Sequence, residues 1–151
     1  DVYKRQQLDG IVRRAVRRFA GEFIGRKLKL CYEPLNVSCV TDEKWLLFVI
    51  EQVLSNALKY TRAGSITIEL EAPKTLVIRD TGIGVAPEDL PRIFEKGYTG
   101  YNGRGDQKAS GLGLYLCRTI CKRLGHTITA SSVPDHGTAI RITLEQRQVR
   151  E

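Results

Sequence analysis

A short turn of one acidic residue and two glycines constrains the fold of this chain more than any other stretch. Asp80-Thr81-Gly82-Ile83-Gly84 follows closely on the apolar run Leu76-Val77-Ile78. Glycine adopts positive φ and lets another molecule approach the main chain closely. A strand that brings a carboxylate to such a turn is suited to hold a flat polar ligand. The same string also occurs as an ordinary strand-to-helix turn, so the turn alone does not indicate a ligand site and other parts of the chain are needed to support one.

Length and composition are those of one globular domain. The chain has 151 residues, of which 42% are hydrophobic and 27% charged, enough for a two-layer core without metal or disulfide links. No apolar stretch is long enough to span a bilayer, and the start has no signal-peptide pattern. Met is absent, so we expect a piece of a longer protein. The cysteines lack zinc-ligand spacing and are expected to be reduced core residues in a cytoplasmic setting: Cys31, Cys39, Cys117 and Cys121.

The formal net charge of +7 invites a nucleic-acid interpretation. Much of this charge lies on Arg13, Arg14, Arg17 and Arg18, on one side of an amphipathic helix predicted over residues 7–24. Aromatic residues are not interleaved with these arginines, as they are in single-stranded nucleic-acid sites. A solvated helix face is therefore the preferred interpretation, and a basic nucleic-acid-binding module is the least favoured alternative.

The second informative stretch is a helix predicted over residues 43–60, capped by Thr41 or Asp42. Its apolar residues recur at three- and four-residue spacing and should face a sheet. Beside them runs a polar stripe: Gln52, Asn56, Lys59 and Tyr60. A structural helix seldom places two amides next to its apolar face, because each amide left unpaired there costs about 1 to 3 kcal/mol. The stripe therefore indicates a ligand, a metal or water.

Hydrophobic periodicity and turn residues predict the remaining elements. Strands are expected over residues 28–32, 37–40, 65–70, 75–79, 127–131 and 138–144, and a short helical turn over 87–90. Residues 95–110 contain Gly97, Gly100, Gly103 and Gly105, which predicts a mobile, functional loop after an apolar plug at Ile93-Phe94. One domain is expected over 7–145, between a leader (1–6) without a usable pattern and a polar tail (146–151).

The loop leads into a helix predicted over residues 111–124, with Ser110 as its cap and Gly125 as its stop. Gly111 and Gly113 in its first turn weaken it by roughly 1 kcal/mol each relative to alanine. This choice makes sense if phosphate groups must reach the exposed N–H groups, where the helix dipole also favours negative charge.

Four features follow one another along the chain in an order that resembles a known protein family. They are the Asn56 stripe, the Asp80 turn, Phe94 before a glycine-rich lid, and the helix start at Gly111. The family that they resemble is the ATP-binding catalytic domain of bacterial sensor histidine kinases, in the GHKL superfamily with gyrase, MutL and a heat-shock chaperone. The resemblance covers residues 8–144. It implies an α+β fold, a two-layer α/β sandwich of the Bergerat type, with a mixed sheet of about five strands packed on three helices.

The strings at 56–60, 94–100 and 111–116 look most like small kinases that sense peptide antibiotics together with transporters. This likeness implies the cytoplasmic domain of a membrane-anchored homodimer. Its partners would be a phosphoacceptor helical hairpin domain of the same protein, a response regulator and a transporter, with no nucleic acid expected. His126 and His136 lack the surroundings of a phosphoacceptor, so a surface or structural role is expected for both.

The resemblance also implies roles for single residues. Asp80 would accept a hydrogen bond from the exocyclic amine of adenine, which selects ATP over GTP. Asn56 would hold Mg²⁺ through its amide oxygen, Lys59 would meet phosphate, and these two are the catalytic candidates. Arg104 and Lys108 either reach the γ-phosphate or are solvated loop charges. The other nucleotide-binding candidates are Tyr60, Gly82, Ile83, Gly84, Lys96, Gly97, Tyr98, Gly111, Leu112, Gly113, Leu114 and Thr138.

Gln52 distinguishes between reaction types. ATP-hydrolysing members of the superfamily place a glutamate four residues before the asparagine, as the base that activates water. Glutamine cannot take a proton, and the neighbouring Glu51 is rotated by about 100° around the helix. The sequence thus favours phosphoryl transfer to a histidine over a gyrase- or MutL-type ATPase domain, which remains the alternative.

Overall fold

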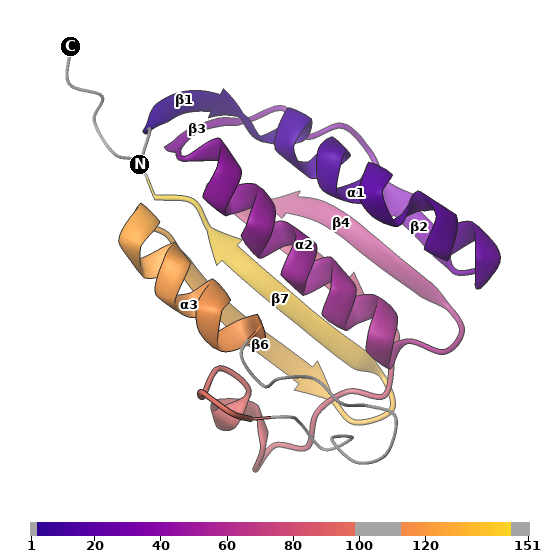
Figure 1. The fold of residues 1–151 in the computed structure, drawn as a ribbon. Helices are drawn as coiled ribbons and strands as arrows, with labels where there is room; N and C mark the ends of the chain where they lie inside the picture. The colour runs from indigo at the N-terminus through magenta and orange to yellow at the C-terminus, as the bar shows by residue number, and fades with distance from the viewer. Residues whose placement is uncertain (1–2, 99–112, 146–151) are drawn as a thin grey trace.

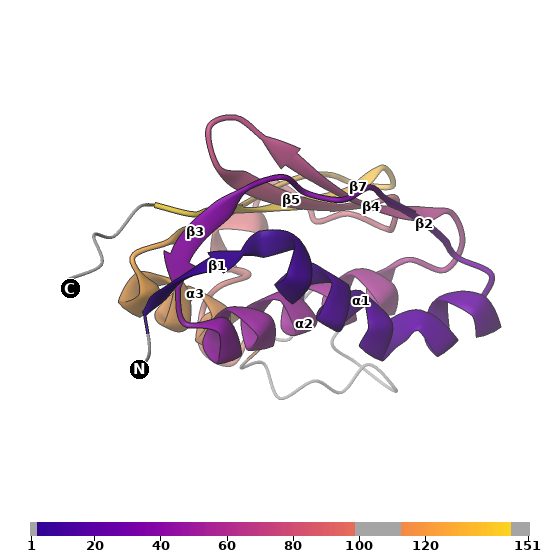
Figure 2. The same ribbon diagram turned by 90° about the horizontal axis from the view of Figure 1, so that it is seen from above.

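A computed structural model describes residues 3–98 and 113–145 and shows two layers (Figure 1). Three helices, α1 (Leu8–Gly25), α2 (Glu43–Tyr60) and α3 (Gly113–Leu124), cover one face of a five-stranded sheet. Seen from above, the sheet and the helices form separate layers (Figure 2). The α+β class and the two-layer arrangement expected from the sequence are confirmed.

The five-stranded sheet is mixed. β2 pairs in parallel with β4, and the other neighbouring strands pair antiparallel. The strand order is β2 (Lys29–Tyr32), β4 (Ser65–Glu71), β5 (Thr75–Asp80), β7 (Gly137–Thr143) and β6 (Thr127–Val133). β5 therefore lies at the centre of the sheet, with β4 on one side and β7 on the other, and Asp80 is its last residue.

A separate two-stranded sheet pairs β1 (Lys4–Gln7) antiparallel with β3 (Ser38–Thr41). The sequence did not predict β1, because Lys-Arg-Gln-Gln shows no apolar alternation and is ordered only by its partner strand. The predicted turn at 87–90 also differs slightly from the structure, where a short 3-10 helix, η1, spans Leu90–Arg92.

α2 is the central element of the core. Its bounds match the prediction, and the side chain of Asp42 caps it by accepting from the backbone N–H groups of Lys44 (3.0 Å) and Trp45 (3.3 Å). The predicted apolar stripe is buried against the sheet: Leu46, Val49, Ile50, Val53, Leu54, Ala57 and Leu58. On α3, Cys117 and Cys121 are fully buried free cysteines, and burial raises the pKa of Cys121 to about 12. Their predicted role as core residues is confirmed.

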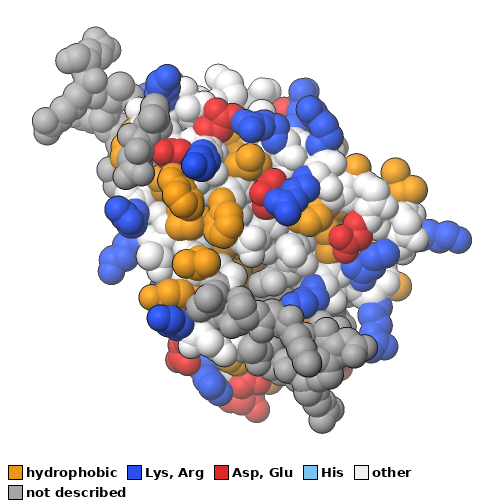
Figure 3. All heavy atoms as spheres, viewed as in Figure 1, with side chains coloured by type: hydrophobic (Ala, Val, Ile, Leu, Met, Phe, Trp, Pro, Cys, Tyr) orange, Lys and Arg blue, Asp and Glu red, His pale blue; other side chains and the backbone are white. Residues whose placement is uncertain are grey.

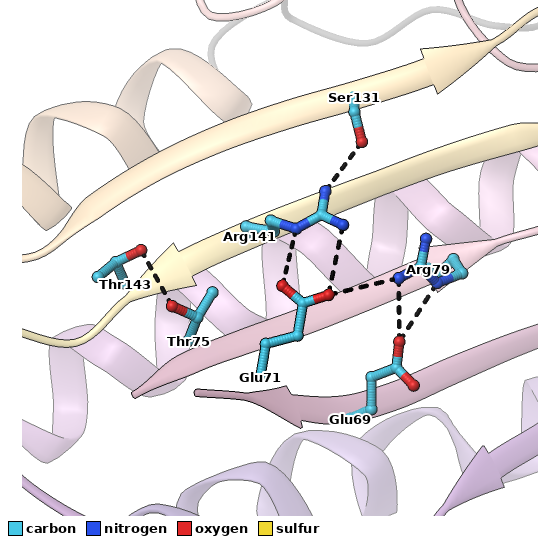
Figure 4. A network of polar contacts seen from close by, with 7 residues as sticks. All are labelled: Glu69, Glu71, Thr75, Arg79, Ser131, Arg141 and Thr143. Carbon is cyan, nitrogen blue, oxygen red and sulfur yellow. Dashed lines mark hydrogen bonds and ion pairs between the residues drawn. The ribbon is translucent and has the colours of Figure 1, made fainter. Parts of the chain in front are cut away.

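A polar network covers the sheet face that the helices leave open (Figure 4). Arg141 contacts both carboxylate oxygens of Glu71, at 3.1 and 3.5 Å, and Ser131 at 2.9 Å. Arg79 lies 3.0 Å from Glu69. Val77, in the same layer, is completely buried. The network thus shields an apolar side chain on the exposed side of the sheet.

The arginines of α1 are largely neutralised by acidic neighbours. Arg13 lies 3.3 Å from Asp9, Arg18 lies 2.8 Å from Glu51, and Arg14 forms an ion pair with Glu43. On the helix-covered face, basic side chains are interspersed with acidic ones (Figure 3). This distribution supports the interpretation of a solvated helix face.

Candidate nucleotide-binding site

Asp80 ends β5 with its side chain on the helix-facing side of the sheet and is 9% exposed. Its Oδ1 accepts hydrogen bonds from the backbone N–H groups of Gly82, at 2.9 Å, and Thr138, at 3.2 Å. Within residues 3–98 and 113–145 no hydrogen bond reaches Oδ2. Burial raises the pKa of Asp80, and the two N–H donors oppose this shift. Within the described residues, backbone N–H groups thus fix one oxygen of the Asp80 carboxylate and not the other.

The Asp80 turn (residues 80–84) packs directly on the end of α2. A Cβ atom on Gly82 would lie 2.2 Å from the carbonyl oxygen of Tyr60. The next residue, Ile83, donates its N–H to the same oxygen at 3.2 Å. Glycine is therefore required at position 82 by the contact with α2, whatever ligand the turn receives.

On its other side the turn contacts the connection between β6 and β7. Gly84 has φ +73°, and a Cβ atom there would lie 2.3 Å from the carbonyl oxygen of Val133. Asp135 N–H donates to Ile83 O at 2.7 Å, and Val85 N–H donates to Ser132 Oγ at 2.7 Å. Ser132 was not predicted from the sequence, because a single serine in a strand gives no signal of a partner 47 positions earlier.

The polar stripe of α2 is half-buried. The Oε1 atom of Gln52 lies 3.2 Å from the position that a Cβ of Gly113 would occupy, so the stripe faces the start of α3. The ammonium of Lys59 lies 5.7 Å from the ring centre of Tyr60, and burial raises the pKa of Tyr60. Asn56 lies between Gln52 and Tyr60, one helical turn from each.

The segment that follows η1 lies against α3. The Lys96 ammonium is 5.9 Å from the Tyr115 ring centre, and the Arg118 guanidinium is 5.7 Å from the Phe94 ring centre. Phe94 is 9% exposed, so the predicted apolar plug is confirmed. Gly97 has φ +86°, and Tyr98 and Leu114 are partly buried against the core. The following predicted residues lie outside the described part of the chain: Arg104, Lys108, Ser110, Gly111 and Leu112.

Two further buried polar side chains are Thr61, which was not singled out from the sequence, and His126, which lies just after the C-terminal end of α3. Thr61, directly after α2, is fully buried, and within the described residues its hydroxyl has no hydrogen-bond partner. That hydroxyl lies 2.9 Å from the position of a Cβ on Gly82. His126 is 2% exposed, and its Nε2 lies 2.9 Å from Thr41 Oγ1. The position of His126 supports the structural role expected for it.

The described residues contain no group of three or more His, Cys, Asp or Glu side chains that could hold a metal ion. Magnesium commonly uses only one or two protein oxygens together with nucleotide phosphates and water. The amide oxygen of Asn56 is compatible with that mode of binding. Among the helices in the described part of the chain, none has the length and apolarity needed to cross a membrane.

The fold that holds these residues is that of a known class of catalytic domain. The catalytic domain of histidine kinase ThkA, in a nucleotide-free form, superposes with a TM-score of 0.82 at 19% sequence identity, over 95% of this chain and 97% of that one. The family model described as histidine kinase-, DNA gyrase B- and HSP90-like ATPase matches residues 41–148. The chain therefore belongs to this ATPase family.

Curated relatives carry the likeness to sensor kinases. Sensor histidine kinase YxdK of Bacillus subtilis is 40% identical over 121 residues, which are 74% of this chain and 37% of YxdK. Sensor protein BceS of Halalkalibacterium halodurans is 42% identical over 107 residues, which are 69% of this chain and 32% of BceS. The resemblance to sensor histidine kinases is confirmed, and the chain spans about a third of these relatives' length.

Proposed function

We propose that this chain binds Mg-ATP and transfers its γ-phosphoryl group to a histidine on a separate helical hairpin domain. The observation that carries this proposal is the geometry of Asp80. One carboxylate oxygen is held by two backbone N–H groups, and the other is left for a hydrogen-bond donor. The exocyclic amine of adenine is such a donor, whereas guanine presents a carbonyl at the same place.

The remaining predicted residues would hold the rest of the nucleotide. Tyr60 would pack near the adenine, and Lys59 would meet phosphate. The N-terminal end of α3 at Gly113 would present N–H groups to the phosphates. The Thr61 hydroxyl supports a polar ligand or water nearby, because a buried hydroxyl without a partner costs about 1 to 3 kcal/mol.

Asn56 would hold the magnesium ion, whose chemistry is to neutralise charge on the β- and γ-phosphates. We expect Asn56→Ala to weaken binding of ATP in the presence of Mg²⁺ by about tenfold or more, because a charge-assisted contact is worth roughly 1.5 to 3 kcal/mol. Affinity for adenosine should not change. Calorimetry with both ligands is the measurement, and an equal loss of affinity for adenosine would contradict a role in metal binding.

Gln52 supports transfer to histidine over hydrolysis. It lies in the α2 stripe next to Gly113, where a water-activating glutamate would stand in an ATPase. We expect the chain alone to release phosphate from ATP very slowly and an added phosphoacceptor domain to become phosphorylated. Phosphate release and radiolabel transfer measure the two reactions. Fast turnover by the isolated chain would favour the gyrase- or MutL-type alternative.

The partners and location belong to the same proposal. The chain spans 37% of YxdK, which leaves room in a longer protein for a membrane anchor, a dimerisation domain and the phosphoacceptor histidine. The proposed role is the cytoplasmic catalytic domain of a homodimeric kinase that phosphorylates a response regulator. The strings at 56–60, 94–100 and 111–116, which resemble small kinases that sense peptide antibiotics, support a place among such sensors that work with a transporter.

A further inference from the structure

The last carbonyl groups of α2 are bonded by residues from distant parts of the chain. A helix leaves its final carbonyls without partners inside the helix. Here Arg26, which follows α1, donates from Nη1 to Leu58 O at 2.6 Å and from Nη2 to Thr61 O at 2.7 Å. The carbonyl oxygen of Tyr60, between these two positions, accepts from Ile83 N–H at 3.2 Å. Arg26 and the Asp80 turn therefore hold the same helix end.

The backbone and the side chain of Arg26 are both held by contacts with Glu22. Its backbone N–H donates to Glu22 O at 3.0 Å, and its guanidinium lies 3.1 Å from the Glu22 carboxylate. A planar guanidinium can bond two carbonyl oxygens at once. A cation at the C-terminal end of a helix is also favoured by the helix dipole. Through these contacts Arg26 connects the C-terminal end of α1 to the C-terminal end of α2.

Arg26 is connected to Asp80 through a short series of contacts. Leu58 and Thr61 flank Tyr60, so their bonds to Arg26 fix the position of the Tyr60 carbonyl. Gly82 packs on that carbonyl so closely that a Cβ atom would lie 2.2 Å from it. The N–H of Gly82 then donates to Asp80 Oδ1 at 2.9 Å. A shift at the end of α2 must therefore move the donor that orients Asp80.

We propose that Arg26 is a positioning residue for nucleotide selection, acting through the Tyr60 carbonyl and Gly82 on the orientation of Asp80. This assignment rests on the proposed function. It adds to that function a residue that touches neither base nor phosphate but sets the preference for adenine over guanine.

The test is the ratio of affinities for ATP and GTP in Arg26→Met. Methionine keeps an unbranched stem but removes the guanidinium donors. We expect the ATP:GTP affinity ratio to fall at least fivefold, because a misoriented Asp80 no longer favours the adenine amine. A merely structural role would lower the folded fraction, which reduces both affinities by one factor and leaves their ratio unchanged. Calorimetric titrations with each nucleotide give the ratio.

Two further variants control this experiment. Arg18→Met removes the same charge from α1 and breaks an ion pair with Glu51 on the side of α2, so its ratio should equal that of the wild type. Arg26→Lys keeps the charge but can bond fewer carbonyls, so its ratio should be intermediate. If Arg26→Met does not fold, an unchanged ratio in Arg26→Lys overturns the assignment.

The outcomes for the two proposals are distinct. A wild-type chain that binds ATP no better than GTP overturns the proposed function itself. A wild-type preference that persists in Arg26→Met, or that falls equally in Arg18→Met, overturns only the assignment to Arg26.

Discussion

Replacing Asp80 by asparagine is expected to lower ATP affinity by about 100-fold or more, which corresponds to a loss of about 2.7 kcal/mol. Asparagine keeps an acceptor oxygen where Oδ1 receives the N–H groups of Gly82 and Thr138. The other carboxylate oxygen becomes an NH₂ group, which is a donor. It would then face the donating amine of adenine, so the variant both loses a charged acceptor and gains a repulsive contact.

The same substitution should not destabilise the fold. Burial raises the pKa of Asp80 in the folded chain, so the folded state binds the proton more tightly than the unfolded state. The contribution of this group to stability is then lost as the pH rises from below the unfolded pKa through the folded pKa. Asparagine has no charge to desolvate. At neutral pH we therefore expect the melting temperature of Asp80→Asn to equal or exceed that of the wild type.

Calorimetric titration with ATP, together with thermal unfolding monitored at neutral pH, measures both effects. Asp89→Asn is a matched control, because it makes the same chemical change in the short segment before η1. Wild-type affinity in Asp80→Asn would remove the basis of the adenine assignment. A large fall in melting temperature would instead show that the charge of Asp80 stabilises the fold.

The features predicted from sequence were those encoded by local patterns. The bounds of α2 and its Asp42 cap follow from a period of apolar residues and a capping residue, both of which lie within one stretch of chain. The acidic glycine turn after β5 is also local. Its prediction as a place where a strand presents a carboxylate agrees with the position of Asp80 at the end of β5.

The features that were missed depend on partners far away in sequence. β1 is a strand because β3 pairs with it, and the partner of Gln6 is Cys39, 33 positions later in the chain. Arg26 bonds carbonyls 32 and 35 positions away. No composition or periodicity near an arginine indicates such contacts. The sequence could therefore suggest candidate groups for a nucleotide site, but not the distant residues that contact the elements carrying them.

Gly137 also contacts a residue far away in sequence, and we expect its substitution to have a large effect. It begins β7, has φ +106°, and a Cβ atom there would lie 1.9 Å from the carbonyl oxygen of Asp80. An L side chain is therefore excluded both by backbone conformation and by space. Gly137→Ala must move the β6–β7 turn away from β5, and with it the N–H of Thr138 that donates to Asp80.

We expect Gly137→Ala to lower the free energy of unfolding by on the order of 2 to 4 kcal/mol and to weaken ATP binding as well. Gly21→Ala is the matched control, because Gly21 lies within α1 and a Cβ atom there would have no other atom within 4 Å. That variant should gain about 0.5 to 1 kcal/mol, since alanine favours helix over glycine. Chemical denaturation of both variants measures the difference. Equal effects would show that the β6–β7 turn is not held in this conformation against Asp80, because the positive φ of Gly137 and its close contact with Asp80 are what reverse the sign of the substitution.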